Sequence, residues 1–264
     1  MPPARPLITL LTDFGTKDHF VASMKGVILS INPAARIIDI THDIAPFQIA
    51  DAAACLRACY RTFPEGTVHV AVVDPGVGSS RRPILVTTAR YYFVAPDNGV
   101  LTPVLAEEQQ VEIRQLESRQ YQLESPGATF HGRDLFAPAA AWLTKGTAST
   151  SFGRLVSDPS RLNRPQPTAM DHNIIGEIVH VDRFGNLISN ISSSQLTGVP
   201  MDTAEVRIES HSISRFVGSY SEGAAGILHA LINSNGNLEL FLKERSASDL
   251  LQIGVGAAVE VKWL

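Results

Sequence analysis

The chain has 264 residues, 44% hydrophobic and 18% charged residues and a formal net charge of −4, which is ordinary for a soluble globular protein of one or two domains. The negative balance argues against nucleic-acid binding, and no apolar run is long enough to span a membrane or form a signal core. The two cysteines, Cys55 and Cys59, are too few for a disulfide framework and lack zinc-ligand spacing, so we expect a cytoplasmic protein.

The first half of the chain alternates strand and helix patterns. Apolar strands are predicted at residues 7–11, 37–40 and 68–73, with helices at 20–30 and 49–62 between them. This succession predicts βαβ units and a mostly parallel sheet. Further strands at 84–88, 91–95 and 111–116 and an Ala-rich helix at 135–143 complete an α/β domain over residues 1–156.

The composition changes after residue 156. Residues 157–172 carry several prolines and no periodicity, which predicts a linker. Short strand patterns then recur at residues 174–181, 187–191, 204–208, 226–232, 238–241 and 258–261. We therefore predict a smaller all-β, barrel-like domain over residues 173–264.

Polar side chains follow the predicted strands of the first domain. Asp13 comes after the first strand, and Asp74, in a breaker triplet with Pro75 and Gly76, comes after the third. In open α/β sheets, ligands bind at the carboxyl ends of the strands. Two arginines, Arg81 and Arg82, lie close enough in sequence for one to fold back on Asp74.

His131 is predicted at or just before a helix N-terminus. A local cap is the simpler interpretation of such a histidine, but Asp, Arg and His on neighbouring loops could hold and activate a water molecule. In the second domain, residues 182–186 (DRFGN) read either as a β-turn or as a pocket wall. In the second case Phe184 would stack on a flat ring and Asn186 would pair with a heterocycle edge.

Several motifs, taken together and in order, resemble the S-adenosyl-L-methionine hydrolase (adenosine-forming) family, also described as S-adenosylmethionine hydroxide adenosyltransferases and related to fluorinases and chlorinases. They are residues 11–18 (LTDFGTKD), 72–78 (VVDPGVG), 95–100 (APDNGV), 129–134 (TFHGRD) and 182–186 (DRFGN). The resemblance runs from about residue 7 to the C-terminus. It implies an α/β domain followed by a β-barrel domain, assembled as a homotrimer.

The resemblance also implies site residues, at a site between the N-terminal domain of one subunit and the C-terminal domain of its neighbour. The water-activating triad of the family falls on Asp74, Arg81 and His131, and Arg81 fits the family spacing better than Arg82. The substrate-binding positions implied are Asp13 for both ribose hydroxyls, Asp18, Asp182 and Ser234 for the methionine part, and Asn186, with Phe184 beside it, for adenine.

The implied activity is hydrolysis of S-adenosyl-L-methionine to adenosine and methionine, with no metal and no cofactor. A sulfonium is an excellent leaving group, so the enzyme mainly has to align the water and make it more nucleophilic. One alternative is a halide-dependent halogenase, although halide-using relatives replace the His-Gly pair that this chain keeps as His131–Gly132. The other is a non-catalytic protein that binds adenosine or S-adenosylmethionine, which would not need a water-activating triad.

Overall fold

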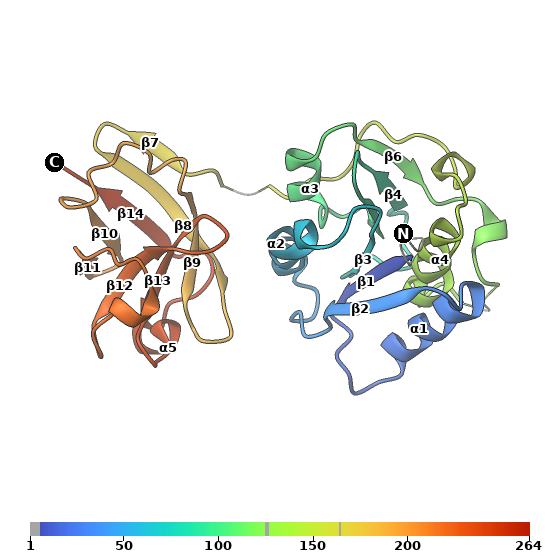
Figure 1. Cartoon of the computed structure of the whole chain (residues 1–264), viewed down its shortest axis with the longest axis horizontal. Coiled ribbons are helices and arrows are strands. Elements are labelled where there is room, and N and C mark those ends of the chain that lie inside the picture. Colours follow the sequence, from blue (N-terminus) through green and yellow to red (C-terminus); the bar gives the residue numbers. More distant parts are fainter. Residues whose placement is uncertain (1–5, 125–126, 164) are drawn as a thin grey trace, which may run out of the picture. The chain divides into compact units, whose positions relative to one another are not determined.

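The computed structural model describes residues 6–124, 127–163 and 165–264. Over these residues the chain divides into two compact units, one ending at Leu162 and the other beginning at Asn163. Figure 1 shows an α/β unit in the N-terminal half and a unit built almost entirely of strands in the C-terminal half. The predicted fold class is confirmed. Among the described residues, no helix has the length and apolar character needed to cross a membrane.

The N-terminal unit contains a six-stranded sheet in the order β2-β1-β3-β5-β4-β6. The strands are β1 (Leu7–Thr12), β2 (Arg36–Thr41), β3 (Val68–Val72), β4 (Pro83–Thr87), β5 (Tyr92–Pro96) and β6 (Glu112–Gln115). The first four in the spatial order run parallel, and β4 and β6 pair antiparallel. The sheet is therefore mixed but largely parallel, as expected.

Helices cover both faces of this sheet (Figure 1). Helices α1 (Phe20–Ile31) and α4 (Ala137–Thr144) share one hydrophobic core with the sheet, and α2 (Ile49–Cys59) shares the other with α3 (Thr102–Glu107). Alternate side chains of a strand point to opposite faces of the sheet, and both faces are covered here. Strand β3 is therefore buried along its whole length. Val70 thus joins the α1/α4 core and Ala71 the α2/α3 core.

The parallel strands end at one edge of the sheet. Thr12 of β1 pairs with Val72 of β3, and Leu11 pairs with Thr41 of β2. The residues that follow these strands, among them Asp13, His42 and Asp74, therefore leave the sheet at the same edge. Ligands bind outside this edge in open α/β sheets.

The C-terminal unit is an antiparallel, barrel-like sheet of eight strands (Figure 1). Its strands are β7 (Thr168–Met170), β8 (Asn173–Val181), β9 (Leu187–Ser192), β10 (Glu205–Ile208), β11 (His211–Ile213), β12 (Leu228–Ile232), β13 (Asn237–Leu242) and β14 (Ala258–Lys262). A short helix, α5 (Ala247–Leu251), follows β13. Inward-facing aliphatic side chains from most of these strands form one core.

Several local features differ from the sequence-based expectations. Strand β7 lies inside the segment predicted as a linker, because Thr168–Met170 pairs with β8. The helix predicted from residue 135 is preceded by a π-helical turn, Gly132–Phe136, and α4 itself begins at Ala137. The last turn of the helix predicted over 49–62 is a 3-10 turn, Tyr60–Thr62. Strand β11 and helix α5 were not predicted, since both are very short.

Candidate active site

Arg81 lies between Asp74 and His131. Its Nε donates to Asp74 Oδ1 at 2.9 Å, and its Nη2 donates to both Asp74 Oδ2 and His131 Nδ1, the latter at 2.6 Å. The Arg81 and Asp74 side chains are 9% and 5% exposed. The remaining guanidinium nitrogen, Nη1, is buried and has no hydrogen-bond partner within the described residues. The structure thus brings the three residues of the expected triad together.

The backbone around the site explains this arrangement. Gly78 has a φ of +79°, and a Cβ there would lie 3.2 Å from the carbonyl oxygen of Ala128. Glycine therefore allows the β3–β4 turn to approach the segment that leads to His131. His131 comes directly before the π-helical turn, a feature frequently found at functional sites. Its side chain makes no capping bond to this turn, so the simple cap interpretation does not hold.

The electrostatics favour a neutral His131. Burial lowers the pKa of His131, the positive charge of Arg81 lowers it further, and the carboxylates of Asp74 and Asp134 act in the opposite direction. Because Arg81 Nη2 donates to Nδ1, that nitrogen must be unprotonated, and the proton of the neutral ring is on Nε2. The bidentate Arg81–Asp74 pair is a charge-assisted contact that fixes the orientation of the guanidinium plane.

The neighbouring Arg82 points to a different partner set. Its Nε and Nη2 donate to Asp97 Oδ2 at 2.9 and 2.6 Å, and its Nη1 donates to Asp158 Oδ1 at 2.7 Å. Asp97 Oδ1 also accepts the backbone N–H of Ser160. Arg82 therefore ties residues 158–160 to the α/β fold. Of the two arginines, it is Arg81 that contacts Asp74.

Two further carboxylates predicted for the site lie in the first unit. Asp13 directly follows β1 and is half-buried, and its Oδ2 accepts the backbone N–H of Phe47 at 2.9 Å. Phe47 has a φ of +69° and its side chain is 67% exposed. Asp18 is exposed in the loop before α1.

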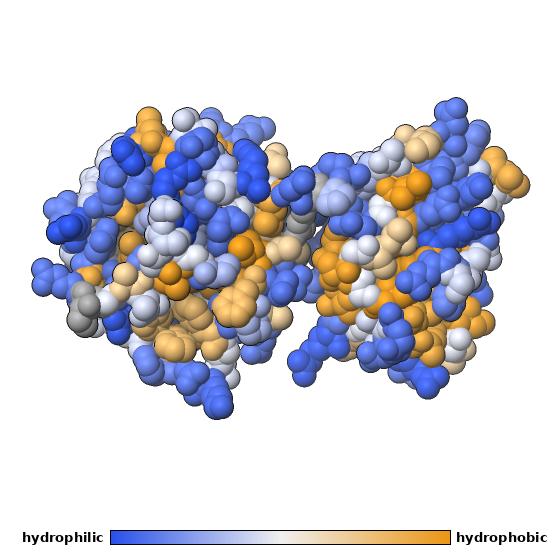
Figure 2. Space-filling model, turned by 180° about the vertical axis from the view of Figure 1, so that it is seen from behind, coloured by the Kyte–Doolittle hydropathy of each residue, from blue (hydrophilic) through white to orange (hydrophobic). Residues whose placement is uncertain are grey.

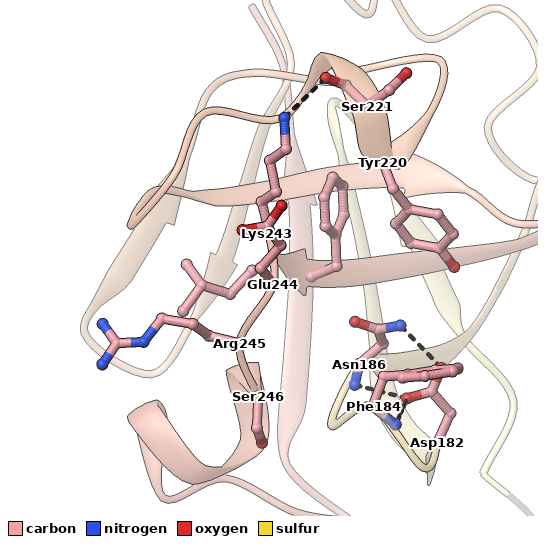
Figure 3. A pocket seen from close by; sticks show the side chains of 11 residues that line it. Asp182, Phe184, Asn186, Tyr220, Ser221, Lys243, Glu244, Arg245 and Ser246 are labelled. Atoms are coloured by element: carbon pink, nitrogen blue, oxygen red, sulfur yellow. Dashed lines mark hydrogen bonds between the residues drawn. The ribbon is translucent and has the colours of Figure 1, made fainter.

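The second unit contains a pocket of about 680 Å³. Figure 3 shows its lining residues, which are Asp182, Phe184, Asn186, Tyr220, Ser221, Phe241, Leu242, Lys243, Glu244, Arg245 and Ser246. Tyr220 packs edge-on against Phe241 with ring centroids 4.9 Å apart. Phe184 is 76% exposed. Aromatic surface combined with polar groups that can orient a ligand is typical of small-molecule sites.

The side chains of Asp182 and Asn186 are hydrogen-bonded to each other at one wall of this pocket (Figure 3). Asp182 Oδ1 accepts the backbone N–H groups of Phe184 and Asn186 at 2.8 and 2.9 Å, and Oδ2 accepts from Asn186 Nδ2 at 2.8 Å. The amide orientation of Asn186 is thereby set, with Oδ1 left as its acceptor. The second Nδ2 hydrogen also remains, so Asn186 can still donate to and accept from a ligand, as the sequence suggested.

Gly185, at the tip of this turn, has a φ of +79°, and a Cβ there would lie 2.8 Å from the Cα of Ser246. The turn is therefore packed on the start of α5, where Ser246 Oγ caps the helix by accepting from the backbone N–H of Asp249. The Ser-x-x-Asp spacing at 246–249 is a capping signal visible in the sequence.

The remaining residues predicted for a site in this unit differ from those that line the pocket. Ser234 lies exposed in the turn between β12 and β13, outside the set of residues that line the pocket. Sequence reasoning missed Tyr220 and residues 243–246, which line the pocket from a loop and from the end of β13. Tyr220 Oη donates to the buried carboxylate of Glu239 at 2.6 Å.

No cluster of three or more His, Cys, Asp or Glu side chains suited to a metal ion occurs in the part of the chain that the structure describes. The two cysteines are free, and burial raises the pKa of Cys59 to about 12, with the neighbouring Cys55 adding to the shift. Neither thiol has the lowered pKa expected of a nucleophile or metal ligand.

Comparison with known proteins identifies both halves of the chain. Residues 8–153 match the family model described as the SAM hydroxide adenosyltransferase N-terminal domain, and residues 176–260 match the corresponding C-terminal domain. The chain is 36% identical to an (R)-S-adenosyl-L-methionine hydrolase of Methanocaldococcus jannaschii, over 97% of this chain and 95% of that protein. It is 29% identical to a fluorinase of Nocardia brasiliensis, over 98% and 97% of the two chains.

A solved structure shows a similar fold. The crystal structure of an uncharacterized conserved protein from Thermotoga maritima superimposes with a TM-score of 0.91 and 38% sequence identity, covering 97% of this chain and 99% of that chain. The similarity therefore extends over both units.

Proposed function

The chain belongs to the SAM hydroxide adenosyltransferase family, and we propose that it hydrolyses S-adenosyl-L-methionine to adenosine and L-methionine. The proposal agrees with the activity named for its relative from Methanocaldococcus jannaschii. Asp74, Arg81 and His131 are the proposed water-activating residues. S-adenosylmethionine is the substrate, and the proposed reaction uses no cofactor.

The observation that carries this proposal is the arrangement of Arg81. Two of its nitrogens are fixed by Asp74 and His131, and the third, Nη1, is buried without a partner in the described residues. A buried, oriented guanidinium N–H is a strong donor for an oxygen nucleophile, and its charge favours the hydroxide form of a bound water. The neutral ring of His131 adds a second donor, Nε2–H.

The reaction balances without an additional reactant. The water oxygen forms a bond to the ribose 5′ carbon, the C5′–S bond breaks, and its electron pair returns to sulfur to give the neutral thioether of methionine. One proton leaves the attacking oxygen. The positive charge of Arg81 favours the loss of this proton, which makes the oxygen the stronger nucleophile.

Asp74 is the base that the geometry supports. Nδ1 of His131 already accepts from Arg81, and Nε2 carries the ring proton. Each carboxylate oxygen of Asp74 accepts one bond from Arg81 and retains a lone pair. We therefore assign proton acceptance to Asp74, orientation and charge stabilisation to Arg81, and water positioning to His131.

Substrate binding is proposed at the remaining positions. Asp13 would accept hydrogen bonds from both ribose hydroxyls. Asn186 would accept from the amino group of adenine through Oδ1, with Phe184 stacked on the ring. Asp18, Asp182 and Ser234 are proposed for the methionine part. Asp182 already accepts three intramolecular bonds, so its ligand contact must use a remaining lone pair.

The assembly proposed is a homotrimer in which each active site combines the N-terminal unit of one subunit with the C-terminal unit of the next. The two sets of residues lie in separate compact units, which supports this arrangement. Figure 2 shows apolar side chains gathered on one face of the C-terminal unit. Exposed apolar residues of this unit include Ile227 and Phe184, which a neighbouring subunit or a ligand would cover.

The proposed organisation is an α/β domain over residues 1–156, a linker over 157–172 and a barrel-like domain over 173–264. Within the proposed linker, the part from 157 to 162 is tied to the α/β fold through Asp158, Ser160 and Leu162. The two free, half-buried cysteines are compatible with a cytoplasmic enzyme.

The test is product analysis in water enriched in oxygen-18, with and without chloride. Hydrolysis at the 5′ carbon predicts adenosine with the heavy oxygen in its 5′-hydroxyl, in the same yield at both chloride concentrations. A 5′-chloro-5′-deoxyadenosine product would instead support the halogenase, the second candidate suggested by the fluorinase relative. Ligand binding without either product would leave a non-catalytic binding protein.

A further inference from the structure

Two threonines of strand β1 are each hydrogen-bonded to a buried histidine. Thr12 Oγ1 lies 2.8 Å from His42 Nδ1, and Thr9 Oγ1 lies 2.8 Å from His69 Nδ1. All four residues are buried. The pairs have the same chemistry but different places in the strand, because Thr12 directly precedes Asp13 and Thr9 lies in the middle of β1.

The Thr12–His42 pair is bonded to the backbone of the loop that carries Asp13. Thr12 Oγ1 accepts the backbone N–H of Phe14 at 3.2 Å, and the carbonyl oxygen of His42 accepts the backbone N–H of Gly15 at 2.8 Å. Asp13 is therefore preceded by Thr12, and the two residues after Asp13 are hydrogen-bonded to Thr12 and His42. The loop has little freedom to move the carboxylate.

The other ring nitrogen of His42, Nε2, is buried and makes no hydrogen bond within the described residues, but a carboxylate lies near it. This nitrogen lies 3.1 Å from Asp39 Oδ1, and Asp39 Oδ2 accepts from Lys25 Nζ at 2.6 Å. Burial acts to raise the pKa of Asp39, but the interactions with Lys25 and His42 outweigh it and hold the pKa below its ordinary value. The carboxylate of Asp39 thus stays charged beside the imidazole, on the side opposite Thr12.

We propose that Thr12 and His42 are positioning residues that hold the Asp13 carboxylate at the geometry required to bind ribose. The inference rests on the proposed role of Asp13 as the ribose-binding carboxylate. The hydroxyl of Thr12 is hydrogen-bonded to His42 Nδ1 and accepts from the backbone N–H of Phe14, so one side chain links the loop to the imidazole. Small displacements of such a group are costly for a bound substrate, because positioning depends on distances of about 1 Å.

The Thr9–His69 pair provides a matched control. His69 packs among Tyr60, Tyr91 and Phe93, and burial lowers its pKa to about 3, so it serves as a neutral core residue. Within the described residues, no hydrogen bond joins this pair to the Asp13 loop. Loss of the Thr9 hydroxyl should therefore lower stability and leave ligand recognition unchanged.

The experiment compares Thr12→Val with Thr9→Val, which remove a buried hydroxyl from the same strand without changing side-chain shape. For each protein, the KM and kcat for S-adenosylmethionine are measured together with the affinities for adenosine and 2′-deoxyadenosine. We expect Thr12→Val to raise KM about tenfold and to reduce the preference for adenosine by a similar factor. Thr9→Val should alter the adenosine preference by less than about twofold, and Thr12→Ser, which keeps the hydroxyl, should restore it.

Every result decides a specific point. If Thr12→Val keeps the adenosine preference of the wild type, or if Thr9→Val loses it equally, the positioning role is wrong and the two pairs are both structural. If His42→Ala and Thr12→Val have fully additive effects on the preference, the two residues do not act as a unit, which also contradicts the proposal. If the wild type itself does not prefer adenosine to 2′-deoxyadenosine, the ribose role of Asp13 fails and the inference fails with it.

Discussion

In the N-terminal unit, Arg81 is hydrogen-bonded to both Asp74 and His131, and the side chains of Arg81 and Asp74 are largely removed from solvent. In the C-terminal unit, the pocket is lined by aromatic side chains, and Phe184 is 76% exposed. The first region has fixed charges with one buried donor left over. The second combines aromatic surface and one oriented amide, that of Asn186, with charged side chains from Asp182 and residues 243–245.

This difference separates two tasks. Preorganised charge in a site with little water stabilises charge that develops during a reaction, because the donors are already oriented. An open aromatic pocket mainly supplies binding area and directional selectivity. Substitutions in the first region should therefore lower kcat, and substitutions in the second should raise KM.

The largest effect is expected at Arg81. Arg81→Ala removes the donor to the nucleophile and leaves Asp74 as a buried carboxylate without its ion pair, so kcat should fall by roughly a thousandfold or more while substrate still binds. Asp74→Ala and His131→Ala should each lose most turnover as well. Single-turnover assays and equilibrium binding separate the two quantities.

Arg82→Ala is the matched control for this prediction. Arg82 is adjacent in sequence and is also held by carboxylates, but these belong to Asp97 and Asp158. We expect a lower melting temperature with kcat within about threefold of wild type. Normal turnover in Arg81→Ala together with its loss in Arg82→Ala would move the catalytic assignment by one residue.

The next largest effect is expected at Asp13. Asp13→Asn keeps one acceptor oxygen but removes the charge, and charge-assisted bonds contribute roughly 1.5–3 kcal/mol each, so affinity should fall about ten- to a hundredfold. The variant should also penalise 2′-deoxyadenosine less than the wild type does. Isothermal titration of both ligands with both proteins tests this. Equal discrimination by the two proteins would show that Asp13 does not contact the 2′-hydroxyl.

A smaller effect is expected in the pocket. Asn186→Ala removes the proposed acceptor for adenine and one partner of Asp182, so KM should rise about tenfold with little change in kcat. Asn190→Ala is the control, because Asn190 bonds the backbone of Glu177 and Pro165 and does not line the pocket. A loss of kcat in Asn186→Ala without a change in KM would contradict the division of tasks between the two regions.

The contrast between the regions also explains how much could be predicted from the sequence. Asp13 and Asp74 were identifiable because parallel strands deliver their carboxyl ends to one edge of a sheet, and this rule needs no knowledge of long-range contacts. The choice between Arg81 and Arg82 was left to the family spacing, because adjacent residues on a turn differ only in direction. That direction becomes visible only in the folded chain, where Arg81 meets Asp74 and His131 and Arg82 meets Asp97 and Asp158.

The pocket was harder to predict. Tyr220 comes from a loop, and residues 243–246 follow β13, so their meeting depends on strand order in an antiparallel sheet. Strand β7 was not predicted for a similar reason, since Thr168–Met170, within the predicted linker, becomes a strand only by pairing with β8. Asp182 and Asn186 could be identified as a turn, but their mutual bond, which orients the amide, follows from the turn geometry.

The smallest expected effect concerns the dependence of kcat on pH: His131 should shift the loss of activity at acidic pH to lower pH. The proposed mechanism uses the neutral ring, because Nδ1 must accept from Arg81 and a doubly protonated ring would set two cations side by side. Burial, followed by the charge of Arg81, lowers the pKa of His131 below its ordinary value near 6.5. The neutral form therefore persists to lower pH than in a free histidine, and activity is lost only as the pH falls through the lowered pKa.

A histidine of ordinary pKa would be neutral in only about a quarter of molecules at pH 6. We therefore expect kcat at pH 6 to remain clearly above about a quarter of its value at pH 8, with a decline that starts at lower pH. The measurement is kcat at saturating S-adenosylmethionine from pH 5 to 8, with unfolding followed at each pH. His131→Asn cannot titrate in this range, so its residual activity should lose this acid limb. If wild type and His131→Asn decline together, another group sets the limb, and the role of His131 as the neutral partner of Arg81 must be given up.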